Sequence, residues 1–237
     1  MSDTGDLRLA AASIPIRDSG NGLEILMVRR NENLSFGGLW TFPGGTLDAS
    51  DGAQPSPPIA ESTDWADPAL LETATTAAIR ETREETNLVC DRSAMTWFSH
   101  WVPPAFGAPK RFATWFFIAR NVSGEMIVDT SENSEARWVK PTAALADWDA
   151  GDFPLAVPTW VTLDDLAGLP TARSVHGAAD DEGPRMHHTR AFRVGDERLL
   201  CWAGDAAYAT GDPDLDGPRN RVLADSSMTN FLRVRRG

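Results

Sequence analysis

The sequence has little cysteine, a deficit of positive charge and no long apolar run. Its two cysteines, Cys90 and Cys201, stand far apart and form no Cys-x-x-Cys or Cys/His cluster. This excludes a disulfide scaffold and the usual zinc sites, so we expect two buried thiols. No stretch approaches the roughly 20 apolar residues of a membrane helix, and MSDTGDLRLA lacks the basic start and apolar segment of a secretory signal. We therefore expect a cytoplasmic protein without membrane contact.

The charge balance limits the kinds of molecule that the protein is expected to bind. The 237 residues include 22 Lys and Arg against 34 Asp and Glu, a formal net charge of −12. Because nucleic-acid binding depends on Lys and Arg that neutralise phosphates, this balance argues against a nucleic-acid partner. The 42% hydrophobic and 24% charged residues are ordinary for a globular chain that buries a core. An anionic substrate could bind only if something offset the negative electrostatic field of the protein.

Turn formers, prolines and apolar spacing predict the elements. Residues 18–22 separate two apolar runs and predict a hairpin. Residues 46–71 are acidic, broken by proline and free of Lys and Arg, so we expect an inserted surface loop. Asp67 suits the N-cap and Pro68 the first turn of a helix that runs to about Asn87. We expect further strands at 95–102, 111–120, 134–140, 187–194 and 198–203, short helices at 141–148 and 158–169, and a loop at 209–221.

The predicted helix carries the strongest chemical signal. Glu81, Glu84 and Glu85 stand at i, i+3 and i+4, so their carboxylates project from one face. Hard divalent cations such as Mg²⁺ or Mn²⁺ take oxygen ligands, and such a cluster can hold them beside a substrate phosphate. The alternative is a solvated helix face on which Arg80 and Glu84 pair at i and i+4.

The sequence around this helix resembles the Nudix box, G-x5-E-x7-R-E-U-x-E-E-x-G-U, where U is a bulky aliphatic residue. Phe42-Pro43-Gly44-Gly45 precede the helix, and the positions that match are Gly45, Arg80, Glu81, Glu84, Glu85 and Leu88. Glu72 stands the required eight residues before Arg80, but 27 positions after Gly45 (72 minus 45), where the pattern has six. Asp51 lies six after Gly45, so either acid is a candidate for the first Glu.

Two further departures concern the helix itself. Thr82 stands where an aliphatic residue is expected, and Asn87 replaces the last glycine. Asn is the second choice after Gly for a left-handed residue that ends a helix, so this replacement has a physical reason. None of the departures removes a candidate metal ligand.

The likeness extends beyond the box. Residues 26–51 and 101–119 are similar to the Nudix branch that contains the peroxisomal coenzyme A diphosphatases, which has an interrupted box and a P-[KR]-R-[FY]-x-T-x-F-F strand. Ala113 stands where that branch has Asp. The resemblance implies an α+β fold, a Nudix-type α/β/α sandwich with a mixed β-sheet. We expect one domain over 1–237, with a core at 7–170, the inserted loop at 46–71 and a C-terminal extension at 171–237.

The resemblance also implies a reaction and a set of site residues. The reaction is metal-dependent hydrolysis of the diphosphate linkage in a nucleoside diphosphate derivative, with coenzyme A or its acyl esters first, then ADP-ribose, NADH and dinucleoside polyphosphates. Mg²⁺ or Mn²⁺ would be held by Glu81, Glu85 and Glu84. The other implied catalytic residues are Arg80, which orients the carboxylates, and Glu84, Glu132 and Glu135, of which Glu132 or Glu135 is the base. The implied substrate-binding residues are Gly44, Gly45, Arg29 and Arg111, with Arg30 and Lys110 as further phosphate partners and Trp40, Trp101 and Trp115 as base platforms.

Two questions stay open at the level of the sequence. A homodimer is possible, but no apolar stripe indicates one. The rival function is a non-catalytic Nudix-fold module that senses a nucleotide, which would be expected to have lost helix carboxylates. Since Glu81, Glu84 and Glu85 are all present, catalysis is favoured.

Overall fold

A mixed β-sheet forms the centre of the protein. The computed structural model describes residues 7–34, 36–53, 63–105 and 110–236. Within this part an eight-stranded sheet runs in the order β10-β6-β7-β1-β2-β3, with β4 paired to β1 and β9 to β2. The pairs β1–β7 and β6–β10 are parallel and the others antiparallel. The strands are β1 (Leu7–Ser19), β2 (Gly22–Arg30), β3 (Trp40–Thr41), β4 (Gly44–Thr46), β6 (Met95–Val102), β7 (Arg111–Ala119), β9 (Asn133–Val139) and β10 (Arg185–His188).

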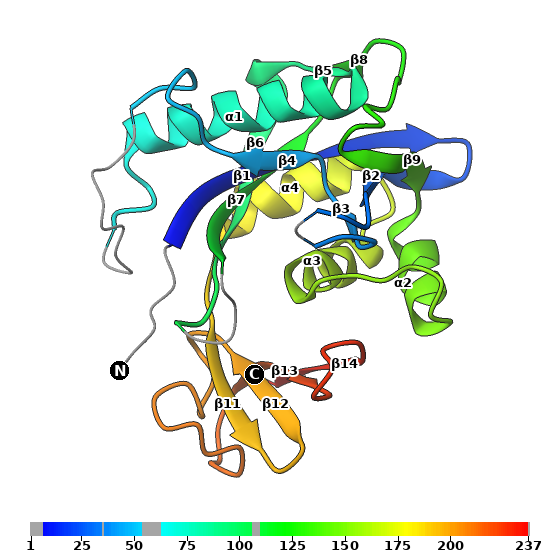
Figure 1. Cartoon of the computed structure of the whole chain (residues 1–237). Coiled ribbons are helices and arrows are strands. Elements are labelled where there is room, and N and C mark those ends of the chain that lie inside the picture. The colour runs from blue at the N-terminus through cyan, green and yellow to red at the C-terminus, as the bar shows by residue number, and fades with distance from the viewer. Residues whose placement is uncertain (1–6, 35, 54–62, 106–109, 237) are drawn as a thin grey trace.

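Helices cover both faces of this sheet (Figure 1). Helix α1 (Pro68–Thr86) lies on one face, whereas α3 (Val157–Ala167) and α4 (Ala172–Glu182) lie on the other, with α2 (Pro141–Asp149) beside α3. Alternate residues of β1 enter two separate core clusters, Leu9 towards α1 and Ile14 towards α3 and α4. A strand buried on both faces is a nearly continuous apolar run, as residues 9–16 are apart from Ser13. The expected α/β/α sandwich is confirmed.

Helix α1 is built as its sequence predicts. The Asp67 carboxylate accepts a hydrogen bond from Leu70 N at 2.9 Å, and Pro68 occupies the first turn. At the other end Asn87 adopts the left-handed conformation with φ of 60°. Thr82 is fully buried, and its hydroxyl lies 2.5 Å from Ser13 Oγ on β1. The polar substitution in the box is therefore satisfied by a partner on the central strand.

The inserted loop is tied to the core at both of its described ends. Thr73 Oγ1 on α1 donates to Ala53 O at 2.9 Å. The Trp65 ring is 3% exposed and stacks on His100 at 4.5 Å, while Trp115 Nε1 donates to Trp65 O at 3.1 Å. Residues 54–62 of the predicted loop lie outside the described residues.

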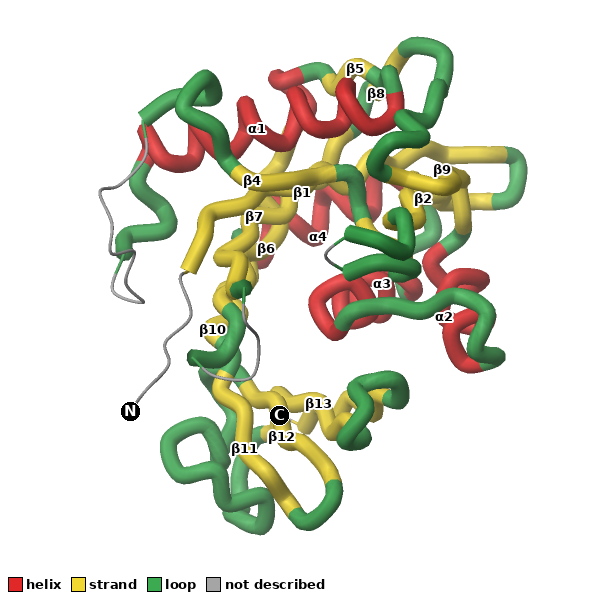
Figure 2. Tube along the Cα trace, viewed as in Figure 1, coloured by secondary structure: helices red, strands yellow, loops and turns green. Residues whose placement is uncertain are grey.

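After α4 and β10, which belong to the sandwich, the rest of the C-terminal extension forms a second sheet, seen below α3 in Figure 1 and as a yellow group in Figure 2. Its antiparallel order is β11-β12-β13-β14, with bounds β11 (Arg190–Val194), β12 (Glu197–Cys201), β13 (Arg219–Ala224) and β14 (Phe231–Arg236). Phe231 stacks on Trp148 of α2 at 5.4 Å, and Trp202 meets Trp101 of β6 edge-on at 5.5 Å. The second sheet thus shares a core with the sandwich. That the whole chain forms one domain stays a prediction.

Several expectations for the later part of the chain need correction. Helices α2 and α3 lie where they were predicted, but the predicted strand 187–194 is divided between β10 and β11, which belong to different sheets. Strand β13 begins inside the predicted loop 209–221, while α4 and β14 carry no clear pattern in the sequence. The remaining short elements are β5 (Val89–Cys90), which pairs with β8 (Val122–Ser123), and the 3₁₀ turn Arg92–Ala94.

The state of the cysteines and the character of the helices can also be compared with the predictions from the sequence. Cys90 and Cys201 are both buried and free, as predicted. Among the helices that the structure describes, none is long and apolar enough to cross a membrane.

Candidate active site

Glu85, in the last turn of α1, lies at the centre of the candidate site. Its side chain is 3% exposed and accepts hydrogen bonds from Gly44 N and from Arg30 Nη1, each at 3.0 Å. Burial raises the pKa of Glu85 to about 7, although the nearby Asn133 amide, the hydrogen bond from Gly44 N and the charge of Arg30 act in the opposite direction. The site therefore holds a carboxyl group that titrates near neutral pH.

Arg80 joins the other acids of the box. Its Nη1 lies 2.9 Å from both Glu81 and Glu84, while Nε and Nη2 each donate to Asp51 at 2.8 Å. The bidentate contact with Asp51 fixes the plane of the guanidinium and so the positions of the two glutamates. Burial raises the pKa of Glu81, which Arg80 only partly counteracts.

The structure also distinguishes the two candidates for the first acid of the box. The Asp51 side chain is 1% exposed and pairs with Arg80. Glu72 is 69% exposed and pairs with Arg92 at 2.7 Å. Asp51 therefore occupies the position that supports Arg80, and the insertion follows this residue.

Gly44 and Gly45 allow strand β4 to approach its neighbours closely. A Cβ on Gly44 would lie 2.5 Å from Ala11 O in the backbone of β1. A Cβ on Gly45 would overlap the carboxylate of Glu81 on α1. Both positions require glycine, but for different reasons: one contact is with rigid backbone and the other with a functional side chain.

This difference predicts distinct effects for two matched substitutions. We expect Gly45→Ala to displace the Glu81 carboxylate and lower kcat/KM roughly tenfold or more with little loss of stability. Gly44→Ala should instead lower the midpoint of urea unfolding, because the β1 backbone must shift. Kinetics and urea titrations of both variants test this. Equal losses of stability would contradict it.

The segment before β9 contributes a fourth glutamate. Arg30 Nη1 lies 3.3 Å from Glu132, which is 49% exposed, and so links Glu132 to Glu85. Asp129 N donates to Glu85 O at 2.9 Å, which anchors this segment to the end of α1. Glu135, the other candidate base, pairs with Arg137 at 3.2 Å instead.

Two expected substrate-binding arginines have other partners in the structure. Arg29 donates to Gly38 O at 3.3 Å and lies 3.7 Å from Glu32. Arg111 is 5% exposed and donates to Pro103 O at 2.9 Å. Neither has a described contact with the glutamates of α1, whereas Arg30, on the next position of β2, has one.

The donor set fits a hard divalent cation in its chemistry. Among the ion pairs of the described residues, five carboxylates, those of Asp51, Glu81, Glu84, Glu85 and Glu132, share two arginines, Arg30 and Arg80. Carboxylate oxygens are the ligands that Mg²⁺ and Mn²⁺ prefer, and the surplus negative charge favours a cation. Among the described residues no three Asp, Glu, His or Cys side chains are already grouped as a metal site. The arginines engage the carboxylates instead.

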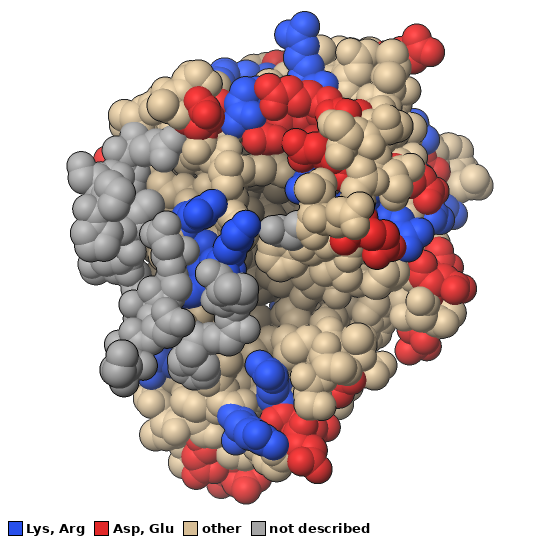
Figure 3. Space-filling model, viewed as in Figure 1, with Lys and Arg blue, Asp and Glu red and all other residues tan. Residues whose placement is uncertain are grey.

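The surface of the protein is hollowed beside this group of acidic residues. Figure 3 shows acidic side chains gathered along α1 over a central hollow, with Lys and Arg atoms also bordering it. The positive side chains at this hollow suit an anionic substrate, and the carboxylates beside it suit a bound cation.

The aromatic residues expected to be base platforms are core residues. Trp40 and Trp115 are 0% exposed and Trp101 is 4% exposed. An aromatic pair with one exposed member was missed by the sequence reasoning: Phe36 is 54% exposed, has a φ of 61°, and lies 6.1 Å from the ring of the half-buried Phe112. A bulky residue in the left-handed region is strained, and such strain clusters at functional sites. The only signal in the sequence was a phenylalanine inside a glycine-rich loop.

The raised pKa of Glu85 predicts a pH-dependent stability. Between its ordinary value of 4.5 and about 7 the folded protein keeps a proton that the unfolded chain releases, so the free energy of unfolding falls as pH rises. From pH 4 to pH 8 in EDTA, the wild type should lose about 3 kcal/mol more than Glu85→Gln. Urea titrations across this range measure the difference. Parallel curves for the two proteins would show that Glu85 titrates normally.

Comparisons with known proteins place this fold and site in a family. The sequence model described as the NUDIX domain matches residues 7–158. A Nudix hydrolase from Alicyclobacillus acidocaldarius is similar in structure, with 26% identity and a TM-score of 0.58 over 71% of this chain and 95% of that one. No curated protein matches the chain. The chain belongs to the Nudix family.

Two other solved structures are more distant. A MutT Nudix hydrolase from Burkholderia pseudomallei has 20% identity and a TM-score of 0.45 over 67% of this chain and 96% of that one. The Nudix domain of NrtR from Shewanella oneidensis, solved with ADP-ribose, has 20% identity and a TM-score of 0.46 over 67% and 84%.

Membership of the family defines the general class of activity. The chain is a pyrophosphatase-type hydrolase that acts on nucleoside diphosphate-linked compounds. The described active-site geometry lies within the matched residues, whereas α4 and the C-terminal sheet lie outside them.

Proposed function

We propose that this chain is a metal-dependent enzyme that cleaves the diphosphate linkage of a nucleoside diphosphate derivative. The observation that carries the proposal is the group of Glu81, Glu84, Glu85 and Glu132 beside Gly44 and Gly45, with burial raising the pKa of two of these glutamates. Glu81, Glu85 and Glu84 are the residues that would hold Mg²⁺ or Mn²⁺. Such a cation, when bound, neutralises phosphate oxygens and activates water.

The protein residues have separate tasks in this proposal. Arg80, fixed by Asp51, orients Glu81 and Glu84. Glu132 is the preferred general base, because it is half exposed and is joined to the cluster through Arg30. It takes a proton from the attacking water as the new P–O bond forms. The bridging P–O bond breaks and its electron pair leaves with the departing phosphate.

The proposed substrates are a group of related compounds. Coenzyme A or its acyl esters come first, as the sequence resemblance implies, followed by ADP-ribose, NADH and dinucleoside polyphosphates. All carry a diphosphate for the carboxylate centre and an aromatic base. A cytoplasmic location and a possible homodimer stay predictions.

The test is hydrolysis of this panel with Mg²⁺, with Mn²⁺ and with EDTA. The products are measured by chromatography, or as the phosphate that a coupling phosphatase releases from the phosphomonoester products. We expect turnover with either metal and none with EDTA. Tight binding of a panel member without turnover in either metal would favour the nucleotide-sensing module instead. Metal-independent turnover would contradict the proposed role of the glutamates.

We further propose that Phe36 and Phe112 hold the aromatic base of the substrate. Base–aromatic stacking contributes about 1–3 kcal/mol, so Phe36→Ala should raise KM roughly fivefold or more with kcat nearly unchanged. Steady-state kinetics on the best panel substrate measure this. Phe36→Tyr is the matched control and should retain KM within about twofold. An unchanged KM in Phe36→Ala would exclude the platform.

A further inference from the structure

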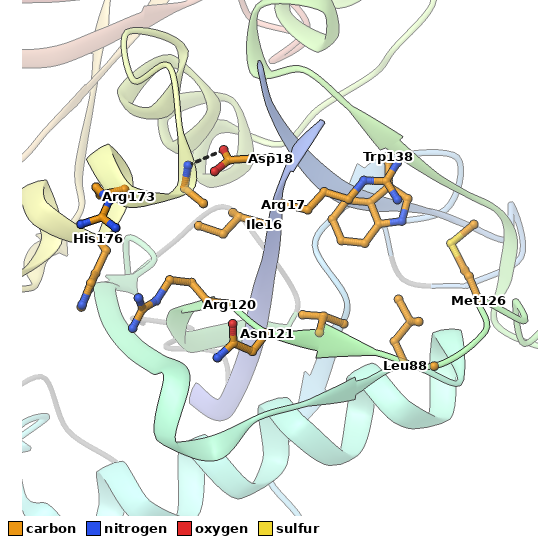
Figure 4. Close-up of a pocket in the computed structure, with 13 residues that line it drawn as sticks. Ile16, Arg17, Asp18, Leu88, Arg120, Asn121, Met126, Trp138, Arg173 and His176 are labelled. Atoms are coloured by element: carbon orange, nitrogen blue, oxygen red, sulfur yellow. Dashed lines mark hydrogen bonds between the residues drawn. The ribbon is translucent and has the colours of Figure 1, made fainter. Parts of the chain in front are cut away.

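A second pocket of about 790 Å³ lies apart from the carboxylate cluster (Figure 4). Its walls come from the end of β1, the turn between β7 and β8, strand β9 and the first turns of α4. It shares no lining residue with the cluster of Glu81, Glu84, Glu85 and Glu132. The volume lies in the range of sites for small organic molecules.

One end of this pocket is cationic. Arg120, Arg173 and His176 lie together at the left of Figure 4. Among the described residues, neither Arg120 nor Arg173 forms an ion pair. Arg120 Nε and His176 Nδ1 are buried there without a hydrogen-bond partner in the described structure. Buried nitrogen atoms of this kind are costly unless something accepts from or donates to them.

The acids around this end are committed to other contacts. Asp18 lines the pocket, but its Oδ1 accepts a hydrogen bond from Ala172 N at 2.7 Å. Asp180 lies 3.3 Å from His176 Nε2, the other ring nitrogen. The pKa of Asp91 is lowered mainly by hydrogen bonds from Ser93, with a smaller effect of Arg120. The two guanidinium groups thus keep donors for an external anion.

The other end of the pocket is apolar. Trp138, Met126 and Leu88 lie at the right of Figure 4, with Ile16 between the two ends. Arg17 lies over the Trp138 ring at 4.2 Å and pairs with Glu24 at 2.7 Å, which holds the indole in place. The Met126 side chain is 36% exposed, so the apolar end is open to solvent.

We propose that this pocket binds a small organic anion with an apolar or aromatic body. The anionic group would lie between Arg120 and Arg173, whose planar donors match carboxylate and phosphate oxygens. The apolar body would lie against Trp138 and Met126. Two guanidinium groups that face one pocket, with no ion pair among the described residues, favour an anion there against the net charge of −12. The inference does not depend on the proposed function.

The test uses 8-anilinonaphthalene-1-sulfonate, which has an aromatic body and one negative charge, as a fluorescent probe. We expect saturable binding to the wild type and at least about tenfold weaker binding to Arg120→Ala/Arg173→Ala, since two charged hydrogen-bonding groups are lost. The matched control is Arg193→Ala/Arg198→Ala, which removes the same charge from an exposed part of β11 and β12 and should change affinity less than twofold. Equal binding to all three proteins would overturn the proposal.

A second variant and a competition series keep the test independent of folding. Met126→Glu places a negative charge at the exposed apolar end and should also weaken probe binding about tenfold, with far-UV circular dichroism and hydrolysis unchanged. Benzoate and phenyl phosphate should displace the probe, and their relative potency distinguishes a carboxylate from a phosphate ligand. Benzyl alcohol should not displace it. Displacement by all three compounds alike, or full binding in Met126→Glu, would overturn the proposal.

Discussion

Glu85→Gln is expected to lower kcat/KM by about 100- to 1,000-fold, the size of effect seen when one electrostatic group that acts on a transition state is removed. The substitution keeps the shape of the side chain but only one of the two acceptor oxygens, which bind Arg30 Nη1 and Gly44 N separately. It removes the negative charge that the proposed cation requires. Steady-state kinetics with Mg²⁺ on the best panel substrate measure the loss.

The control for this experiment is Glu125→Gln, which removes a charge from an exposed side chain outside the cluster. It should leave kcat/KM within about twofold, because single surface charges are strongly screened. A small loss in Glu85→Gln, similar to that of Glu125→Gln, would remove Glu85 from the proposed catalytic centre. A large loss in both would indicate a general effect of charge.

The largest expected effect on stability lies in the C-terminal sheet. Asp205 has a fully buried side chain, and Arg221, 5% exposed, donates to it through Nε at 2.8 Å and Nη2 at 2.5 Å. Arg221→Met would leave a buried carboxylate without its charged partner. We expect the free energy of unfolding to fall by about 3–5 kcal/mol, the usual cost of breaking a buried ion pair on one side.

Urea titrations followed by circular dichroism measure this loss, with Arg92→Met as the matched control. Arg92 is 45% exposed and pairs with the exposed Glu72, so its replacement should cost less than about 1 kcal/mol. An Arg221→Met variant as stable as Arg92→Met would show that Asp205 is satisfied by its backbone contacts alone. Those contacts come from Asn220 N and Ala207 N.

Local features of the fold could be predicted, whereas contacts between distant residues could not. The limits of α1 follow from Asp67, Pro68 and Asn87, whose effects act within one helical turn. The strands of the C-terminal sheet were partly missed because β13 and β14 carry several Arg residues, which interrupt the apolar pattern. Such strands are stabilised by cross-strand contacts more than by intrinsic preference.

The same distinction applies to the candidate site. The shared face of Glu81, Glu84 and Glu85 follows from helical spacing alone. The contacts of Arg30 and Glu132 do not, because Arg30 reaches Glu85 from β2 and also binds Glu132 in the segment before β9. Arg29 and Arg30 lie on opposite faces of a strand, and only the position of α1 decides which of them reaches the carboxylates.

The anchoring of the inserted segment has a consequence for how such proteins are recognised and engineered. Asp51 and Ala53 on one side and Trp65 on the other are held by contacts that do not involve the residues between them. The entropic cost of joining two such anchors rises by only about 0.6 kcal/mol for each doubling of the number of residues between them. Homologues can therefore gain or lose residues between these anchors at little cost, and a search pattern with fixed spacing will overlook them. A peptide tag or a small folded unit inserted between Ala53 and Trp65 would leave these anchoring contacts in place.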